Sequence, residues 1–126
     1  MFGCDAIAGI ETLRTVLPDD MQAWYKFGHI LELHFQECFD EAAFRTTHCM
    51  ELLLTDYREQ YKIRMTLFNV KGQVSFDIVN GFFSGLTIDD CFELGYEKES
   101  RFRLSSFEMD IDFTIYCERI AVELVP

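Results

Sequence analysis

Residues 61–67, Tyr-Lys-Ile-Arg-Met-Thr-Leu, alternate strictly between apolar and polar side chains. Because successive side chains of a β-strand point to opposite faces, this period of two predicts a strand with one buried face. The same alternation recurs on both sides of this stretch, at residues 30–36, 50–54, 74–78, 101–107, 111–117 and 120–124. With the turn signals between them, these segments predict about seven or eight strands.

The connections between the predicted strands favour antiparallel pairing. Asn80-Gly81 is a strong hairpin signal, since a type I′ turn needs positive φ at both central positions, and residues 82–88 would return antiparallel. A second hairpin loop is expected at Asn69–Gly72, and residues 40–46 form either a loop or one helical turn. No alternation of strands with helices is visible. The predicted fold class is α+β, mainly β, with an antiparallel meander that forms a sandwich or a strongly curved sheet.

A short helix is expected near the N-terminus, at residues 5–17. Its apolar positions follow the spacing of one helical face, namely Ala6, Ile10, Leu13 and Leu17. Asp5 is a suitable N-cap residue, and Pro18 would end the helix. We expect this helix to pack on one face or at one end of the sheet.

The last two apolar runs differ in parity. Ile115 and Cys117 occupy odd positions, whereas Ile120 and Val122 occupy even ones. A shift of one residue would turn every later side chain to the other face of a continuous strand. The sequence therefore predicts a bulge or a sharp bend at residues 118–119.

Length and composition indicate one globular domain that spans residues 1–126. The hydrophobic fraction of 49% is ordinary for a globular protein and argues against disorder. The five cysteines are odd in number and show no C-x-x-C spacing. Residues 1–10 lack the features of a signal peptide, and no apolar run is long enough to span a membrane. These features predict a cytoplasmic protein with reduced thiols.

The charge is strongly negative, with a formal net charge of −11. Such a surface repels nucleic acids and anionic membranes and attracts basic proteins. The carboxylates concentrate in one acidic run, which we take as the candidate partner-binding site: Asp89, Asp90, Glu93, Glu97, Glu99, Glu108, Asp110 and Asp112. The last three would share one strand face, where they repel each other unless a basic partner docks. The alternative is a plain solvated edge.

The sequence offers no constellation that predicts catalysis. The three histidines, His29, His34 and His48, do not have the spacing of a structural zinc motif. Cys91 follows two aspartates, which disfavour a reactive thiolate. A phosphate-binding glycine loop, a nucleophile elbow and a calcium loop are all missing from the sequence. We therefore predict no enzyme activity, no catalytic residue, no metal and no cofactor.

Three segments resemble small immunity proteins of bacterial polymorphic toxin systems of the contact-dependent inhibition type. They are Phe27-Gly28-His29, the strand and turn at 74–81, and residues 115–122, Ile-Tyr-Cys-Glu-Arg-Ile-Ala-Val. In the family pattern an Asp often follows the His, where this chain has Ile30. The resemblance covers residues 27–125 and rests mostly on hydrophobic spacing. It implies a cytoplasmic antidote that binds and neutralises a cognate toxin, and an acidic surface would suit a basic toxin such as a nuclease.

Other functions remain open at this stage. A small-ligand-binding β-barrel would need a cavity lined by residues such as Phe76, Phe102 and Phe113. An enzyme would need an Asp or Glu that is buried with a raised pKa. An acidic scaffold protein is a further alternative. The sequence leaves the oligomeric state undetermined, because an unpaired sheet edge can also join two copies.

Overall fold

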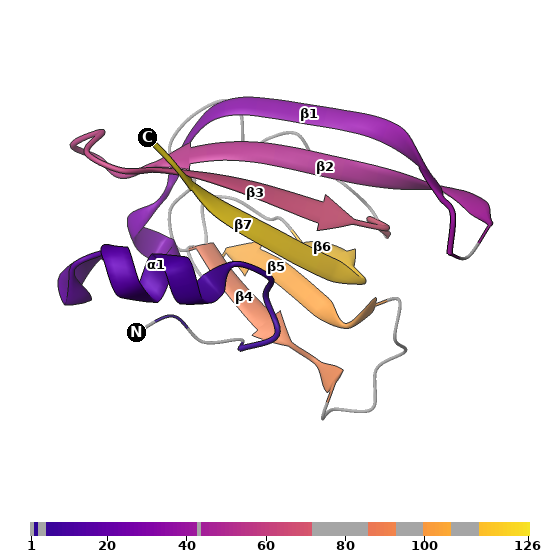
Figure 1. The fold of residues 1–126 in the computed structure, drawn as a ribbon, viewed down its shortest axis with the longest axis horizontal. Helices are drawn as coiled ribbons and strands as arrows, with labels where there is room; N and C mark the ends of the chain where they lie inside the picture. The colour runs from indigo at the N-terminus through magenta and orange to yellow at the C-terminus, as the bar shows by residue number, and fades with distance from the viewer. Residues whose placement is uncertain (1, 3–4, 43, 72–85, 93–99, 107–113) are drawn as a thin grey trace.

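A computed structural model describes residues 2, 5–42, 44–71, 86–92, 100–106 and 114–126. They form two antiparallel sheets (Figure 1). The four-stranded sheet has the order β1-β2-β3-β7, with the bounds His29–Asp40, Arg45–Thr55, Lys62–Phe68 and Arg119–Val125. The three-stranded sheet has the order β4-β5-β6, with the bounds Leu86–Asp90, Phe102–Ser106 and Thr114–Cys117. The predicted class, mainly β with antiparallel strands, is confirmed, and the sheets do not close into a barrel.

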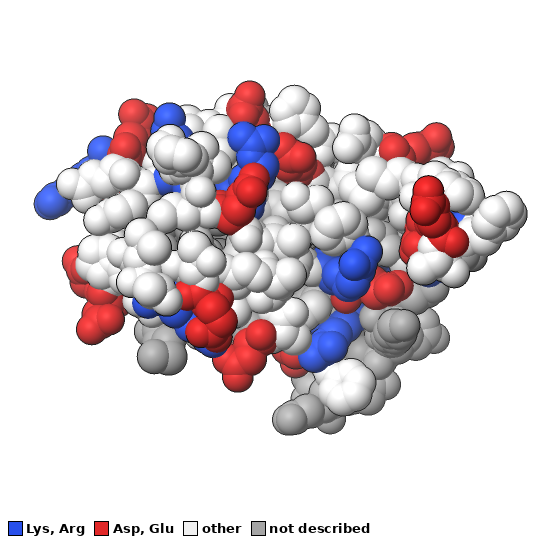
Figure 2. Space-filling model, viewed as in Figure 1, with Lys and Arg blue, Asp and Glu red and all other residues white. Residues whose placement is uncertain are grey.

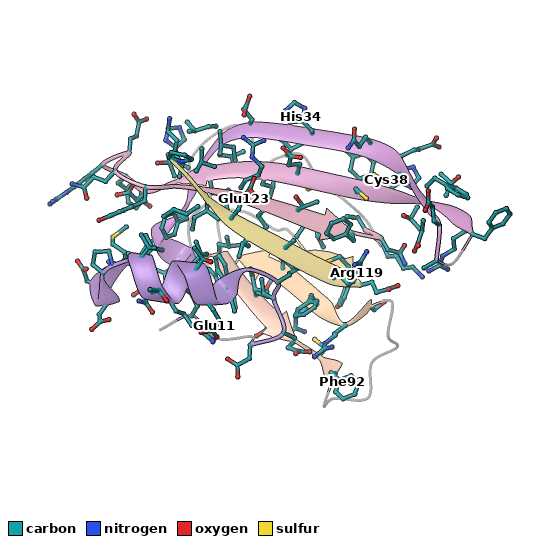
Figure 3. The ribbon with its side chains drawn as sticks, viewed as in Figure 1. Glu11, His34, Cys38, Phe92, Arg119 and Glu123 are labelled. Atoms are coloured by element: carbon teal, nitrogen blue, oxygen red, sulfur yellow. The ribbon has the colours of Figure 1, made fainter. Side chains whose placement is uncertain are left out.

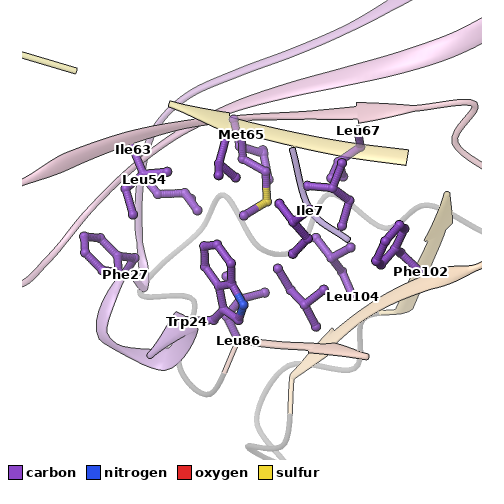
Figure 4. Packing of buried hydrophobic residues seen from close by; sticks show 14 of the residues in the cluster. Ile7, Trp24, Phe27, Leu54, Ile63, Met65, Leu67, Leu86, Phe102 and Leu104 are labelled. Atoms are coloured by element: carbon purple, nitrogen blue, oxygen red, sulfur yellow. The ribbon is translucent and has the colours of Figure 1, made fainter. Parts of the chain in front are cut away.

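The hydrophobic core lies between the sheets (Figure 4). The alternation of the sequence sends every second side chain into it, as in β3, where Ile63, Met65 and Leu67 are buried. Phe102 and Leu104 enter the core from β5. The aromatic segment before β1 forms a 3₁₀ turn, η2 (Trp24–Lys26), which adds Trp24. A second 3₁₀ turn, η1, spans Asp19–Met21.

The predicted bend at residues 118–119 is confirmed. β6 ends at Cys117 in one sheet, and β7 begins at Arg119 in the other. The change of parity keeps Cys117 and Ile120 both buried although they belong to different sheets. Glu118 is thus the residue at which the chain crosses from one layer to the other.

The N-terminal helix is shorter than expected. α1 spans Ile10–Val16, so the predicted start near Asp5 is wrong, whereas the predicted end before Pro18 is confirmed. The N-cap is Gly9, whose φ of 87° lies in the left-handed region that glycine tolerates. Asp5 instead accepts a hydrogen bond from the Arg14 guanidinium at 2.6 Å.

The segment before α1 lies along the edge of β7. Ala8 forms a parallel bridge with Ala121, in which the Ala8 amide donates to the Ile120 carbonyl at 3.0 Å. The Val122 amide donates to the Ala8 carbonyl at 2.8 Å, and α1 packs against the same strand. The β7 edge of the four-stranded sheet is therefore covered, whereas β1 ends the sheet order on the other side.

One predicted connection is visible in part. Asn69, with φ 57°, directly follows β3, and Lys71 then bridges Tyr116 of β6. The rest of the predicted hairpin loop, the strand at 74–78 and the Asn80-Gly81 turn lie outside the described residues. No helix in the described part of the chain is long and apolar enough to cross a membrane.

Candidate functional site

Asp89 and Asp90, the first two residues of the predicted acidic run, lie on β4 and pair with Arg103 of β5 and with Arg101, which directly precedes β5. Asp89 accepts a hydrogen bond from Arg103 at 3.0 Å. Both oxygens of Asp90 accept from Arg101, at 3.0 and 2.9 Å. The Arg101 guanidinium lowers the pKa of Asp90. These pairs offset charge that a partner would otherwise meet.

The other six residues of the predicted site lie outside the described residues: Glu93, Glu97, Glu99, Glu108, Asp110 and Asp112. The acidic run as a binding face therefore stays a prediction. In the view of Figure 2, acidic and basic side chains are interspersed rather than gathered by sign. Charge alone does not mark a site on this face.

β1 is a long edge strand. Eleven of its 12 residues pair with β2 on one side, with Leu31 in a bulge, and no described strand lies on the other side. It carries three carboxylates, Glu32, Glu37 and Asp40, and its sequence contains no lysine or arginine. Most of its side chains are exposed. Proteins usually shorten, cover or interrupt such an edge, because it can pair with a strand of another chain.

The β1–β2 hairpin extends beyond the rest of its sheet. The register of β2 with β3 ends at the pair Met50–Leu67, whereas its register with β1 continues to Asp40–Arg45. Residues 36–49 thus form a two-stranded arm at the end of the molecule opposite to both termini (Figure 1). The polar segment at 40–46 was expected to be a loop or a helical turn, and it contains the turn of this arm.

One face of the arm carries aromatic side chains. Phe35 stacks on His48 with ring centroids 5.4 Å apart and planes 5° apart. Phe39 meets Phe44 edge to face at 5.5 Å. We call these four residues the aromatic row. Phe39 is 57% exposed and Phe44 is 83% exposed, which is unusual for large apolar side chains that lie next to each other.

The aromatic row continues the buried face of the sheet into solvent. Phe35 lies opposite Met50, which is fully buried, and Phe39 lies opposite Thr46 on the same face. Leu52 and Leu54 occupy this face farther along β2, inside the core. Apolar side chains therefore continue along this face into the arm, and no described residue covers the face there.

The opposite face of the arm borders a groove of about 320 Å³. Its lining includes the arm residues Cys38, Asp40, Thr47 and Cys49, and the residues Phe68, Asn69, Glu118 and Arg119. The Arg119 guanidinium lies 4.6 Å from the centroid of the Phe68 ring, a cation–π contact. Asn69 donates to the Glu118 carboxylate at 3.3 Å, and Arg45 lies 3.7 Å from the same carboxylate.

The histidines lie on the same hairpin as the arm. His29 and His34 are on β1, and His48 is on β2. His48 is the ring that stacks on Phe35. Among the residues that the structure describes, no three His, Cys, Asp or Glu side chains form a group that could hold a metal.

The structure bears on two alternative functions that the sequence left open, a carrier barrel and an enzyme. Phe102, one of the expected cavity residues of a carrier barrel, is packed in the core of two open sheets, and Phe76 and Phe113 lie outside the described residues. Asp56 is the buried carboxylate of the described part. Its Oδ1 accepts hydrogen bonds from the Gln60 and Tyr61 amides at 2.8 and 3.1 Å, so it holds the turn between β2 and β3.

The sequence interpretation missed the aromatic row as a site. Phe39 and Phe44 flank a polar turn and were not assigned to a strand face. The available signal was an aromatic residue on each side of a short polar segment between two strand patterns, which is typical of a hairpin end.

Comparisons with protein-family models, with curated proteins and with solved structures found no match.

Proposed function

We propose that this chain binds a basic protein partner through the exposed edge of β1 and the aromatic row, and that the partner is a toxin domain that it neutralises in the cytoplasm. The observation that carries the proposal is a 12-residue edge strand that carries carboxylates and leads into exposed aromatic side chains. The resemblance to immunity proteins supplies the kind of partner. The proposal is one of binding, and it assigns no catalytic residue.

Edge strands bind extended segments through main-chain hydrogen bonds, while neighbouring side chains supply specificity. Exposed aromatic rings are the usual centres of binding energy at protein interfaces. Phe39 and Phe44 offer such rings next to the edge strand. The aromatic row would anchor the partner, and the strand edge would align it.

Charge favours a basic partner over an acidic one. The net charge of −11 attracts cationic surfaces, and Glu32 and Glu37 lie exposed on the edge strand itself. Opposite charges speed association and make it sensitive to salt. The predicted acidic run, residues 89–112, would add to this attraction at longer range.

The test is binding of the purified chain to the product of the gene next to its own, measured at rising salt. We expect the association rate to fall as salt increases. We expect Phe39→Ser to weaken affinity about tenfold or more, and Glu37→Lys to slow association. The readout of neutralisation is the survival of cells that express the partner.

Two matched variants serve as controls. Tyr57→Ser removes an aromatic ring that is 61% exposed in the turn between β2 and β3. Asp19→Lys makes the same change of charge as Glu37→Lys at exposed η1. Both controls should bind like the unchanged chain. Equal effects of the arm and control variants, or an association rate indifferent to salt, would contradict the proposal.

A further inference from the structure

Cys38 and Cys49 occupy the same face of the arm on neighbouring strands. The register places Cys38 opposite Thr47, and Cys49 opposite Gln36. The two cysteines are therefore diagonal neighbours, and side chains on one face of an antiparallel pair reach each other in this relation. The two thiols share a hydrogen bond. Both side chains line the groove of the arm, and Figure 3 labels Cys38 on the arm.

The two thiols differ in access. Cys38 is half-buried, whereas Cys49 is only 4% exposed. A reagent that enters the groove therefore meets Cys38 first, and Cys49 lies diagonally beside it on β2. Burial, followed by the hydrogen bond with Cys38, raises the pKa of Cys49 to about 11. Cys49 thus keeps its proton at neutral pH.

The other described cysteines are placed differently. Cys91 follows β4 and Cys117 ends β6, with β5 between these two strands. Two strand spacings amount to about 9.6 Å, which exceeds the reach of a disulfide. Burial also raises the pKa of Cys117 to about 12. Neither thiol has the relation that joins Cys38 to Cys49.

We infer that Cys38 and Cys49 form a reversible oxidation site, at which a peroxide closes an intramolecular disulfide across the arm. The site stands apart from the proposed partner binding, because it rests on the register and the groove alone. It lies on the face of the arm opposite to the aromatic row.

The chemistry balances in two steps. The Cys38 thiol releases its proton, and the thiolate attacks one oxygen of hydrogen peroxide. An S–O bond forms as the O–O bond breaks, and the departing hydroxide takes up that one proton and leaves as water. The Cys49 thiol then attacks the Cys38 sulfur, so that an S–S bond forms and the S–O bond breaks. The departing hydroxide takes the Cys49 proton and leaves as a second water. The two thiols lose two electrons and two protons, and the peroxide is reduced to two waters.

The diagonal relation also predicts that the disulfide is easily reduced. Diagonal Cα atoms on paired strands lie about 7–8 Å apart, whereas disulfides usually join Cα atoms that are about 4.4–6.8 Å apart. Closing the bond therefore draws the two strands of the arm together and leaves strain in the product. A strained disulfide has a high reduction potential, so mild thiol reagents should reopen it.

The experiment treats the full reduced chain with hydrogen peroxide, blocks remaining thiols and maps the peptides by mass spectrometry. We expect a peptide pair that joins residues 38 and 49, with a mass about 2 Da below that of the two thiol peptides, and we expect dithiothreitol to reverse the bond. Cys38→Ser should lower the yield of this pair more than tenfold. Cys91→Ser is the matched control, and it should leave the yield unchanged.

Cys49→Ala is a second variant. Because Cys49 is buried, circular dichroism is used to check that this variant still folds. In this variant the peroxide should leave Cys38 as a sulfenic acid, which dimedone traps. If peroxide converted Cys38 of the unchanged chain to a sulfinic acid without forming a disulfide, the inference would be wrong. A bridge to Cys4, Cys91 or Cys117, or a dimer linked through Cys38, would overturn it as well.

Discussion

Gly9 joins the segment beside β7 to α1, and it has no room for a side chain. A Cβ at this position would meet the Val122 carbonyl oxygen at 2.1 Å, and φ is +87°. We expect Gly9→Ala to lower the free energy of unfolding by about 2 kcal/mol or more. Urea unfolding measures the change.

Gly9→Asn separates the two causes. Asparagine tolerates the left-handed region better than alanine, but its Cβ meets the same carbonyl. If the contact with Val122 dominates, both variants lose similar stability. A clear recovery in the asparagine variant would instead assign the loss to the backbone dihedral.

The start of α1 also explains a wrong prediction. Asp5 is a good capping residue by type, and the apolar spacing reaches back to Ala6, so the pattern favoured a longer helix. The structure instead pairs Ala8 with β7 and uses Asp5 to bind Arg14. The contact of Ala8 with β7 joins distant parts of the sequence, and local patterns do not contain it.

Asp56 organises the turn between β2 and β3 at the scale of one hairpin. It accepts the amides of Gln60 and Tyr61 while it is buried. Asp56→Ala leaves two inward amides without an acceptor, and we expect it to cost about 2 kcal/mol of stability. Asp56→Asn keeps an acceptor oxygen and should cost less. Equal losses for the two variants in urea unfolding would argue against the capping role.

The pair Asp90–Arg101 predicts how the β4–β5 hairpin responds to acid. The arginine lowers the pKa of Asp90 in the folded chain. A lowered folded pKa stabilises the fold above the pKa of the unfolded chain, about 3.9 for Asp, and this contribution is lost as pH falls through the folded pKa. At pH 7 we expect Asp90→Asn to cost about 1 kcal/mol.

Unfolding of both proteins from pH 7 to pH 2 checks this expectation. The stability difference between the unchanged chain and Asp90→Asn should stay constant down to about pH 5 and then shrink. Asp20→Asn, at an exposed site of η1, is the control and should show little difference at any pH. A gap that widens toward low pH would refute the assigned pairing.

The elements themselves were largely predictable from alternation, because strands with one buried face keep a strict period of two. The burial of side chains in β3 alternates from end to end. The arm does not, since Gln36, Glu37 and Phe39 are all exposed on its β1 strand, where burial no longer selects side chains. The candidate site was harder to predict for this reason.

At the scale of the whole molecule, one cluster of buried residues joins both sheets, and exposed aromatic residues stand apart from it. Phe102 is 2% exposed within that cluster. We expect Phe102→Ala to cost about 3–5 kcal/mol by leaving a cavity between the layers. Phe39→Ala, on the arm, should change stability by less than about 0.5 kcal/mol. Urea unfolding of the two variants tests this division between core and aromatic row.

The alternation of apolar and polar residues alone did not show which sheet each strand joins. The parity change at Glu118 marked where the chain bends, but the neighbours of each strand depend on contacts across the core. The order β1-β2-β3-β7 brings the last strand beside the third. No local pattern records that pairing.

The bridge between Ala8 and Ala121 has a consequence for stoichiometry. A sheet with a single accessible edge can add one strand from outside, and its assembly then stops at a complex of two chains. A sheet with two accessible edges can add chains at both sides and grow into a fibre. By pairing with part of the β7 edge, Ala8 leaves β1 as the accessible edge of the four-stranded sheet among the described strands, so that strand pairing through this sheet ends at two chains.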